Sequence, residues 1–504
     1  MSAVMTQSQT HSPANARTLL AEAEAACARG DRIAGIDLVR RIVATDEKLG
    51  TDWVVPAMMA AELLDFDTAA KAAKRLCNED GKDPRQWRLY AGLLQNIGRA
   101  AEASEILESI RRAAPNDDDL AYEAGFAAKL AGDFDKARAR YQGVIANQPK
   151  HLLARTELAG IGKVARGDEN LIELETERVR ILEGGRADRH AGAICYALAK
   201  AYDDLGEYAL CASRAAEGAG FMKAVEPYDP AANHRFTRAL MGLFTPEFVE
   251  ANAGKGVADE RPVFVLGPPR SGTTLVESIL GAHPDAKAGG EHKLFWLASL
   301  ELGVQADGTL AKWLETKGEG AWAELGARYL VDVEGRLGPA KRWIDKNLYN
   351  VNRLGLAALA LPEARFIWCR RDPMDVAWSA WKTLFAEGNR WSYDPVAIAA
   401  FLADYDMLMQ HWAALFPGRI LEVIYEDLVA NPDAEIARIV AFCGLEDDPV
   451  TRAFHEQDRT VATASFAQVR QPISAKSVGA WKRYMPAVKP LGDALHAEGI
   501  DFAE

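Results

Sequence analysis

Cysteine is scarce in this sequence, and no two cysteines stand at a metal-binding spacing. The six cysteines are scattered over 504 residues without a CxxC pair. Zinc sites and disulfide frameworks need clustered or regularly spaced cysteines, so the pattern supports neither. Scattered thiols are typical of proteins in a reducing compartment. We therefore expect reduced cysteines, no metal and a cytoplasmic location.

Long hydrophobic runs and an excess of positive charge are also missing. The residues before position 30 lack an apolar core long enough for a signal peptide, and no later run approaches the roughly 20 residues that span a membrane. The formal net charge is −13 at pH 7. This balance argues against broad binding of nucleic acids or anionic membranes, although it permits a local basic cleft. We expect no membrane span and no nucleic-acid partner.

A period of 34 residues runs through the first half of the chain. One series of equivalent positions shows it directly: Gly30, Leu64, Gly98 and Gly132. Small residues at most of these positions suit the turns between closely packed helices. Pro115 and Pro149 keep the same interval near expected helix ends, where proline stops a helix. The period and pattern resemble the tetratricopeptide repeat, an antiparallel helix pair that stacks into a solenoid.

The chain divides into three expected regions. Residues 14–225 are predicted to form tetratricopeptide-like helical repeats, residues 226–260 a connecting helix and linker, and residues 261–504 an α/β domain. The predicted fold is an α-helical repeat solenoid followed by a P-loop-like domain with a parallel sheet, because strands and helices alternate in the second half. A solenoid offers a concave surface for a peptide or protein. The sequence leaves open whether the repeats bind a substrate or partner, mediate a homodimer, or only brace the second domain.

The α/β region opens with a strand, a glycine loop and a helix. Val263 to Leu266 form a short apolar run typical of a buried parallel strand. The loop GPPRSGTT begins at Gly267, and the free N–H groups at such a helix start bind anions. The nucleotide loop GxxxxGK[ST] has a lysine where this chain has Thr273, and the nearest cation here is Arg270. The loop therefore suits a terminal phosphate better than a magnesium-bound triphosphate.

The segment PRSGTTL, residues 269–275, resembles the 5′-phosphosulfate loop of sulfotransferases that use 3′-phosphoadenosine 5′-phosphosulfate (PAPS). The longer run through Glu291 is most similar to protein-tyrosine sulfotransferases and to bacterial sulfotransferases with tetratricopeptide repeats. Scattered motifs extend the resemblance over residues 260–485. It implies PAPS as co-substrate, no metal, and a loop that contacts the nucleotide. The implied loop contacts are Arg270, Ser271, Gly272, Thr273 and Thr274.

The resemblance also assigns nucleotide contacts outside the loop. Arg371 and Ser379 have the spacing of the family's 3′-phosphate site, where a guanidinium and a hydroxyl grip one phosphate. Tyr425, in a Tyr-Glu-Asp-Leu segment, is expected to line the adenine pocket. Ser465 corresponds to a nucleotide-contacting serine. The plainer alternatives are a surface ion pair for Arg371 and a core position for Tyr425.

Two positions depart from the family pattern. The family often has a cation four residues after the serine of the 3′-phosphate site, where this chain has Thr383, so Lys382 is a substitute to consider. It usually has Lys or Arg at the position of Ala480, so Lys476 or Lys482 would take that role. The resemblance therefore leaves two cations of the nucleotide site unassigned.

The catalytic residues are implied by register with the protein-tyrosine sulfotransferases. Sulfuryl transfer resembles phosphoryl transfer, so positioning and charge stabilisation matter more than covalent catalysis. The acceptor must lose a proton, and Glu291 is the expected base. His292 is the alternative base, because its usual pKa lies closer to neutral. Lys346, in an Asp-Lys pair, and Arg270 are expected to neutralise the departing phosphate.

The sequence thus predicts a PAPS-dependent sulfotransferase that acts on a hydroxyl or amine. The repeats and the catalytic register suggest a peptide tyrosine as acceptor, but a carbohydrate, lipid or small hydroxylated molecule would equally suit a glutamate base. A P-loop kinase or NTPase is the first alternative, and the missing loop lysine argues against it. A repeat scaffold whose catalytic half has decayed is the second. The joint presence of five candidate site residues argues against it: Arg270, Glu291, Lys346, Arg371 and Ser379.

Overall fold

The computed structural model describes residues 15–29, 31–80, 82–185, 188–304, 309–385, 388–456 and 471–503. Contacts divide the chain after Ala131 into two compact units. Within the described ranges, no helix combines the length and the apolar character that crossing a membrane requires.

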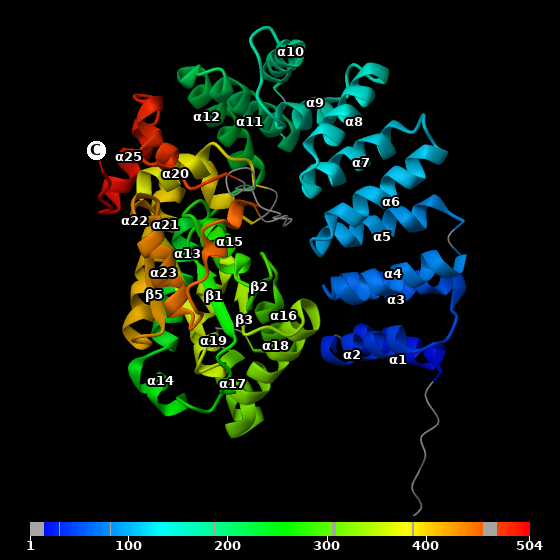
Figure 1. The fold of residues 1–504 in the computed structure, drawn as a ribbon, viewed down its shortest axis with the longest axis vertical. Helices are drawn as coiled ribbons and strands as arrows, with labels where there is room; N and C mark the ends of the chain where they lie inside the picture. Colours follow the sequence, from blue (N-terminus) through cyan, green and yellow to red (C-terminus); the bar gives the residue numbers. More distant parts are fainter. Residues whose placement is uncertain are drawn as a thin grey trace, which may run out of the picture. The chain divides into compact units, whose positions relative to one another are not determined.

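The first unit is built from helices that pack on their sequence neighbours (Figure 1). They are α1 (Ala16–Ala28), α2 (Arg32–Ala44), η1 (Gly50–Trp53), α3 (Val54–Glu62), α4 (Phe66–Asp80), α5 (Pro84–Asn96), α6 (Ala100–Ala113) and α7 (Asp118–Ala131). Alanines make up much of the packed surface, as in α4, where Ala69, Ala72 and Ala73 are fully buried. Small side chains let neighbouring backbones approach closely. The helix-rich N-terminal region is confirmed, while a tetratricopeptide-like solenoid stays a prediction.

The 34-residue period marks tight turns after helices. Leu64, Gly98 and Gly132 have φ angles of 64°, 78° and 84°, and each lies just beyond the end of a helix. Gly30 lies outside the described residues. The left-handed conformation is easy for glycine but costs other residues about 1–2 kcal/mol. A shared backbone requirement therefore explains why glycine recurs at this interval.

Replacing Gly98 with alanine is expected to lower the free energy of unfolding by about 1 kcal/mol, because the new Cβ disfavours the left-handed backbone. No atom of the described residues lies within 4 Å of that Cβ, so backbone strain is the expected cause of the loss. The matched control is Gly92→Ala inside α5, where the added methyl also meets nothing within 4 Å. It should stabilise by about 0.5–1 kcal/mol, since alanine favours the helix. Urea unfolding of the full chain measures both, and an equal loss in both variants would contradict the turn assignment.

The second unit begins with a further series of helices. They are α8 (Phe134–Asn147), α9 (Leu152–Ala159), α10 (Glu169–Glu183), α11 (Arg189–Asp204), α12 (Tyr208–Val225), α13 (Pro230–Leu243) and α14 (Pro246–Asn252). Helices α11 and α12 pack closely along each other. Glycines permit this approach, since a Cβ on Gly192 would come within 2.8 Å of Met222 Sδ and one on Gly218 within 3.1 Å of Cys195 Cβ.

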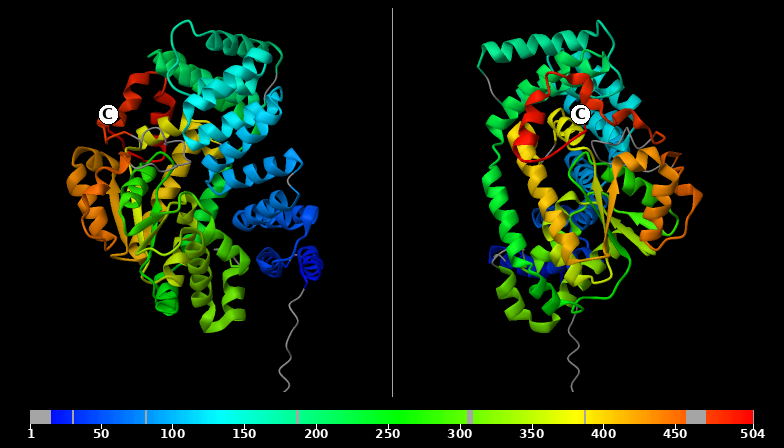
Figure 2. Two further views of the ribbon diagram at one scale, coloured as in Figure 1. Left: turned by 45° about the vertical axis from the view of Figure 1, so that its right-hand side comes forward. Right: turned by 90° about the vertical axis from the view of Figure 1, so that its left-hand side faces the viewer.

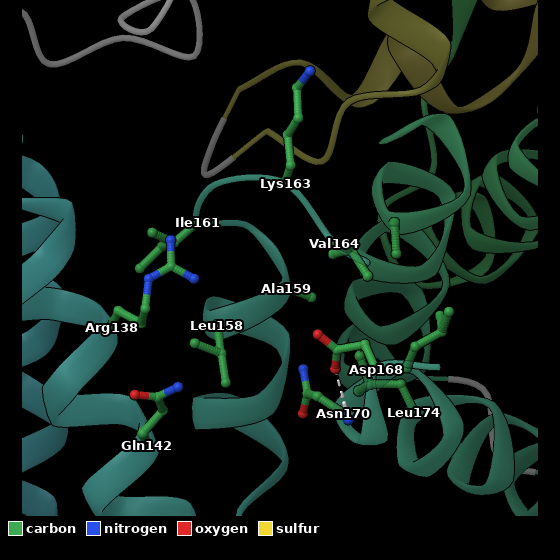
Figure 3. Close-up of a pocket in the computed structure, with 12 residues that line it drawn as sticks. Arg138, Gln142, Leu158, Ala159, Ile161, Lys163, Val164, Asp168, Asn170 and Leu174 are labelled. Atoms are coloured by element: carbon green, nitrogen blue, oxygen red, sulfur yellow. Dashed lines mark hydrogen bonds between the residues drawn. The ribbon is translucent and has the colours of Figure 1, made fainter. Parts of the chain in front are cut away.

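A small cavity of about 60 Å³ lies among α8, α9, α10 and the loop between the last two (Figure 3). The side chain of Arg138 reaches toward Ile161 in this region, whereas Lys163 points away from the other lining residues. The Asp168 carboxylate accepts a hydrogen bond of 2.8 Å from the N–H of Asn170 and so caps α10. Pockets for small molecules usually exceed about 300 Å³. This cavity is therefore too small to be a ligand site.

The rest of the second unit is a five-stranded sheet with helices on both faces (Figure 2). The strands are β1 (Pro262–Leu266), β2 (Ala286–Ala288), β3 (Arg342–Asp345), β4 (Arg365–Arg370) and β5 (Ile420–Ile424). All neighbours pair in parallel, in the order β2-β3-β1-β4-β5. The predicted parallel sheet and its opening strand are therefore confirmed.

The helices around the sheet explain why β1 is apolar throughout. In chain order they are α15 (Thr273–Ala282), α16 (Leu294–Glu301), α17 (Thr309–Lys317), η2 (Gly318–Gly320), α18 (Ala321–Leu337), η3 (Leu348–Arg353), α19 (Leu354–Ala360), α20 (Pro373–Trp381), η4 (Arg390–Tyr393), α21 (Pro395–Leu415), α22 (Tyr425–Ala430), α23 (Pro432–Phe442), η5 (Pro449–Thr451), η6 (Phe454–Glu456), η7 (Ala475–Ser477), η8 (Ala480–Tyr484) and α25 (Lys489–Ala497). Val263 and Val265 pack in one core with residues of α15 and α23, whereas Phe264 and Leu266 pack in another with residues of α18 and α21. Both faces of the strand are buried, as in other parallel sheets covered by helices.

The strand order places a switch point at the centre of the sheet. After β1 the chain builds β2 and β3 on one side, and then β4 and β5 on the other. Open α/β sheets bind ligands in the crevice beyond the carboxyl ends of the strands at such a point. The segments that follow β1, β3 and β4 are therefore where a site is expected.

Candidate active site

The loop after β1 is a compact turn that only glycine can close. Gly272 has a φ of 97° and caps the N-terminus of α15. A Cβ on Gly272 would lie 2.7 Å from the Tyr425 ring, and one on Gly267 would lie 2.7 Å from the carbonyl oxygen of Cys369. Arg270 also has a positive φ of 76°, which is unusual for a residue with a side chain. Such strain concentrates at functional sites.

The hydroxyl of Ser271 is buried in this loop without a hydrogen-bond partner among the described residues. The residue is 1% exposed, and leaving a buried hydroxyl unsatisfied costs about 1–3 kcal/mol. Thr273 and Thr274 are also buried and begin α15. The helix N-terminus carries partial positive charge, so an anion would satisfy both features together.

Arg270, Ser379 and Arg371 meet, although they are far apart in the sequence. The Arg270 Nε donates to Ser379 Oγ at 2.8 Å, and the Arg371 Nη1 donates to the carbonyl oxygen of Arg270 at 3.1 Å. Burial, with repulsion from Arg371 as the second cause, lowers the pKa of Arg270 to about 10. Two guanidinium groups held together in this way favour a bound anion, because it would offset the desolvation of both.

Arg371 is embedded rather than exposed. Its side chain is 8% exposed and lies 3.4 Å from the Asp375 carboxylate, and its carbon Cζ lies 4.7 Å above the centre of the Tyr425 ring. The Arg371 Nε is buried without a partner among the described residues. The ion pair that offered the plainer explanation for Arg371 is therefore present but buried, and it leaves one donor unused.

Ser477 joins this group, although the sequence did not single it out. Its carbonyl oxygen accepts from Arg371 Nη2, and its hydroxyl lies 2.6 Å from the Tyr425 hydroxyl. The predicted contact Lys476, one residue earlier, has an exposed side chain. Its carbonyl oxygen accepts from Arg483 Nη2 at 3.3 Å. The predicted contact Ser465 lies outside the described residues.

The second part of the site forms where β2 and β3 end side by side. Their backbones stay paired beyond the strands, since the N–H of Gly289 donates to Ile344 at 2.9 Å and that of Lys346 donates to Gly290 at 3.3 Å. This pairing brings Glu291 against Lys346, and the Lys346 Nζ donates to Glu291 Oε1 at 2.6 Å. The Lys346 side chain is fully buried, whereas that of Glu291 is 47% exposed. The partly exposed carboxylate of Glu291 thus pairs with the buried ammonium group of Lys346.

Glu277 of α15 is the second carboxylate at Lys346, and sequence reasoning missed it. Its Oε2 lies 3.6 Å from Lys346 Nζ, and its Oε1 accepts from the N–H of Gly290 at 2.8 Å. Glu277 is buried and follows Thr273 by one helical turn. An acidic residue in an otherwise apolar helix was the available signal. Through its contacts with Gly290 and Lys346, Glu277 keeps the backbone next to Glu291 in place.

The His292 side chain is buried and lies next to Asp345. The residue is 6% exposed, its Nδ1 lies 3.6 Å from Asp345 Oδ2, and its Nε2 has no partner among the described residues. Burial, followed by repulsion from Arg336, lowers the pKa of His292 to about 3. A buried ring with so low a pKa is poorly placed to take a proton from an external acceptor. Of the two candidate bases, only Glu291 has a side chain that is partly exposed.

Lys382, the substitute considered for the cation missing at Thr383, contacts other residues in this structure. Its Nζ donates to Asp203 Oδ2 of α11 at 2.8 Å and lies 3.3 Å from the Tyr484 hydroxyl. The Thr383 hydroxyl donates to the carbonyl oxygen of Ser379 at 2.7 Å. Lys382 is therefore engaged with the helical region rather than with Ser379.

The comparisons with known proteins agree with this geometry. The model of the sulfotransferase family matches residues 262–449. A Caenorhabditis briggsae protein named "Putative protein-tyrosine sulfotransferase" is 31% identical over 233 residues, which are 44% of this chain and 81% of that protein. An uncharacterized protein of Aquifex aeolicus is 28% identical over 459 residues, which are 87% of this chain, and the chain spans 58% of that protein's length.

One solved structure with a partial match is the sulfotransferase domain of the Synechococcus PCC 7002 olefin synthase. It matches with a TM-score of 0.35 and 21% identity over 49% of this chain and 98% of that domain. The match over most of the Caenorhabditis protein, together with the family model, decides the assignment. The chain belongs to the sulfotransferase family and is similar to its protein-tyrosine sulfotransferases.

Proposed function

We propose that the protein transfers a sulfuryl group from PAPS to a hydroxyl of an acceptor by in-line displacement. The observation that carries this proposal is the buried loop of Arg270 and Ser271, which opens α15 without a lysine after Gly272. Family membership supports sulfuryl transfer as the reaction class.

The residues present fit the two anionic ends of PAPS. Ser271 offers an unpaired buried hydroxyl, and Arg371 offers an unpaired buried N–H, both counted among the described residues. The loop from Arg270 to Thr274 would hold the 5′-phosphosulfate, because it combines a cation, hydroxyls and a helix N-terminus. Arg371 and Ser379 would hold the 3′-phosphate, and Tyr425 would line the adenine pocket.

When bound, PAPS supplies a sulfuryl group on a phosphate leaving group. Glu291 would take the proton of the acceptor hydroxyl, since its carboxylate is partly exposed and can be approached from solvent. Lys346 and Arg270 would stabilise negative charge on the leaving oxygen, because preorganised cations at a buried site act strongly there. Glu277 would keep Gly290 and Lys346 in place.

The acceptor that we favour is a peptide tyrosine. Its support is the similarity to proteins named as protein-tyrosine sulfotransferases in Caenorhabditis briggsae and Drosophila melanogaster, the latter 24% identical over 266 residues. The helical repeats would bind the peptide or a partner protein, as extended helical surfaces commonly do. Incubation with sulfur-labelled PAPS and cell lysate, followed by identification of the labelled product, tests the acceptor class.

Nucleotide binding tests the proposal itself against a kinase or NTPase. Calorimetry should detect binding of PAPS or its product adenosine 3′,5′-bisphosphate (PAP) without added metal, because the guanidinium groups, hydroxyls and helix N-terminus of the described site can bind the phosphates directly. Tight binding of magnesium-bound ATP, with no binding of PAP, would overturn the proposed function.

Replacing Arg371 with alanine is expected to weaken PAP binding roughly 10–100-fold, since a charged hydrogen-bond partner of the 3′-phosphate is lost. Binding of AMP, which lacks that phosphate, should change much less. The neighbouring Arg370→Ala is the matched control, because Arg370 is exposed and pairs with Glu422 and Asp406 instead. Equal losses for PAP and AMP would show that Arg371 does not recognise the 3′-phosphate.

A further inference from the structure

A short segment near the C-terminus holds the side chains of the nucleotide site. We call residues 475–484, which contain η7 and η8, the closing segment. Ser477 of this segment contacts both Arg371 and Tyr425. Asp375 of α20 accepts hydrogen bonds from two backbone N–H groups of the segment, that of Gly479 at 2.7 Å and that of residue 481 at 3.4 Å. The closing segment thus helps to hold the Arg371 side chain, together with Arg270 and Asp375.

The C-terminal end of the closing segment, at Tyr484, contacts helices α11 and α12. Tyr484 is buried, and its hydroxyl donates to Asp203 Oδ1 of α11. Its ring also packs edge-on against Tyr208 of α12, with ring centroids 5.1 Å apart. Burial, followed by the hydrogen bond to Asp203, raises the pKa of Tyr484, so the hydroxyl keeps its proton and remains a donor.

The same carboxylate holds the end of helix α20. Asp203 Oδ2 accepts from Lys382 Nζ at 2.8 Å, and Lys382 is the C-cap residue of α20. Helix α20 carries Asp375 and Ser379, and Arg371 lies two residues before its start. Asp203 is therefore tied through Tyr484 to the closing segment, which contacts Arg371, and through Lys382 to α20, which carries Ser379.

We propose that Asp203 is a positioning residue for the nucleotide site. Through Asp203, helix α11 fixes the positions of the closing segment and α20 relative to each other. The proposal rests on the proposed function, because it concerns the same nucleotide. It gives the helical region of the second unit a role in nucleotide binding. The apolar core that α11 and α12 share with α20, α21 and α25 supplies the packing, and Asp203 supplies the directional contacts.

The test compares Asp203→Asn with Asp204→Asn in the full chain. Asparagine at 203 keeps the shape but removes the charge that holds Lys382, so the affinity for PAP should fall roughly ten-fold. The KM for PAPS should rise by a similar factor, while kcat at saturating PAPS stays within about two-fold, because Asp203 touches neither Glu291 nor Lys346. Asp204 is the control, since it pairs with Lys200 at 2.6 Å and accepts from the N–H of Val164 at 3.0 Å, both within the helical region.

Hydrogen exchange in the ligand-free protein provides the second readout. The N–H groups of Gly479 and Trp481 should exchange faster in Asp203→Asn than in Asp204→Asn, because the closing segment loses its anchor. Tyr484→Phe should repeat the effect, and the double variant Asp203→Asn/Tyr484→Phe should lose less than the sum of the two single changes.

Unchanged exchange and unchanged PAP affinity in Asp203→Asn would overturn the proposal, and so would equal effects of Asp203→Asn and Asp204→Asn. If the unaltered protein binds no PAP, the proposed function fails, and the positioning role fails with it. Faster exchange in Asp203→Asn would then show only that Asp203 anchors the segment. Because the unaltered protein's own binding is measured first, the two failures are distinguishable.

Discussion

Replacing Glu291 with glutamine is expected to lower kcat roughly 10²–10⁴-fold, the usual contribution of a general base. Glutamine can still accept the hydrogen bond from Lys346 Nζ that Glu291 Oε1 accepts at 2.6 Å, so the local geometry is kept. It cannot take a proton from the acceptor. PAP affinity, measured by calorimetry, should remain within about two-fold of the unaltered protein, because the change removes chemistry rather than nucleotide contacts.

Chemical rescue distinguishes a role of Glu291 as general base from a purely structural role. The Glu291 side chain is 47% exposed, so a small carboxylate such as formate can enter the space left in Glu291→Ala. Formate should restore part of the turnover of Glu291→Ala and none of the turnover of Arg371→Ala. His292→Gln is the variant that tests the alternative base. A large loss of kcat in folded His292→Gln, with little loss in Glu291→Gln, would reverse the assignment of the base.

Replacing Lys346 with methionine is expected to lower kcat roughly 10²–10³-fold, because a preorganised cation at the leaving group is lost. The substitution also leaves the buried carboxylate of Glu277 without its cation. Removing one partner of a buried ion pair commonly costs about 3–5 kcal/mol of stability. Lys346→Met should therefore lose both turnover and stability, measured by steady-state kinetics and by urea unfolding.

A double variant separates the two effects of Lys346. In Lys346→Met/Glu277→Gln the buried group opposite position 346 is neutral, so much of the lost stability should return. The amide oxygen of glutamine can still accept from the N–H of Gly290, as Glu277 does at 2.8 Å. Turnover should stay low, because the cation is still missing. Recovery of turnover together with stability would show that Lys346 acts only as a structural partner of Glu277.

Much of the candidate nucleotide site lies in one stretch of the sequence, so its residues could be proposed without a structure. The residues from Gly267 to Thr274 form one continuous loop. Its glycine spacing, its hydroxyl side chains and the absence of a lysine after Gly272 can all be read directly from the sequence. The buried strand before it was equally visible, since a parallel strand covered on both faces is apolar throughout. The 34-residue interval likewise marks positions that share a positive φ angle, namely Leu64, Gly98 and Gly132.

The supporting residues could not be predicted in this way. In the sequence, Glu277 is a single charged residue in an otherwise apolar helix. Nothing in the sequence distinguishes Asp203 from Asp204, although Asp203 contacts Lys382 and Asp204 contacts Lys200. Which of two adjacent carboxylates supports the site depends on the rotation of α11 against its neighbours. Side-chain periodicity describes a helix by itself and carries no information on that contact.

Sequence motifs alone predicted the reaction class, from a phosphate-type loop whose residues are contiguous, and the parallel sheet, from its apolar strands. The packing of the chain distinguishes the two candidate bases, since His292 is buried whereas the Glu291 side chain is partly exposed and pairs with Lys346. The same packing joins Asp203 of α11 to Tyr484, 281 residues away in the chain, which no sequence pattern indicated. The physical reason is that burial and hydrogen-bond partners are set by packing between distant segments, whereas loop chemistry is set by neighbours in sequence.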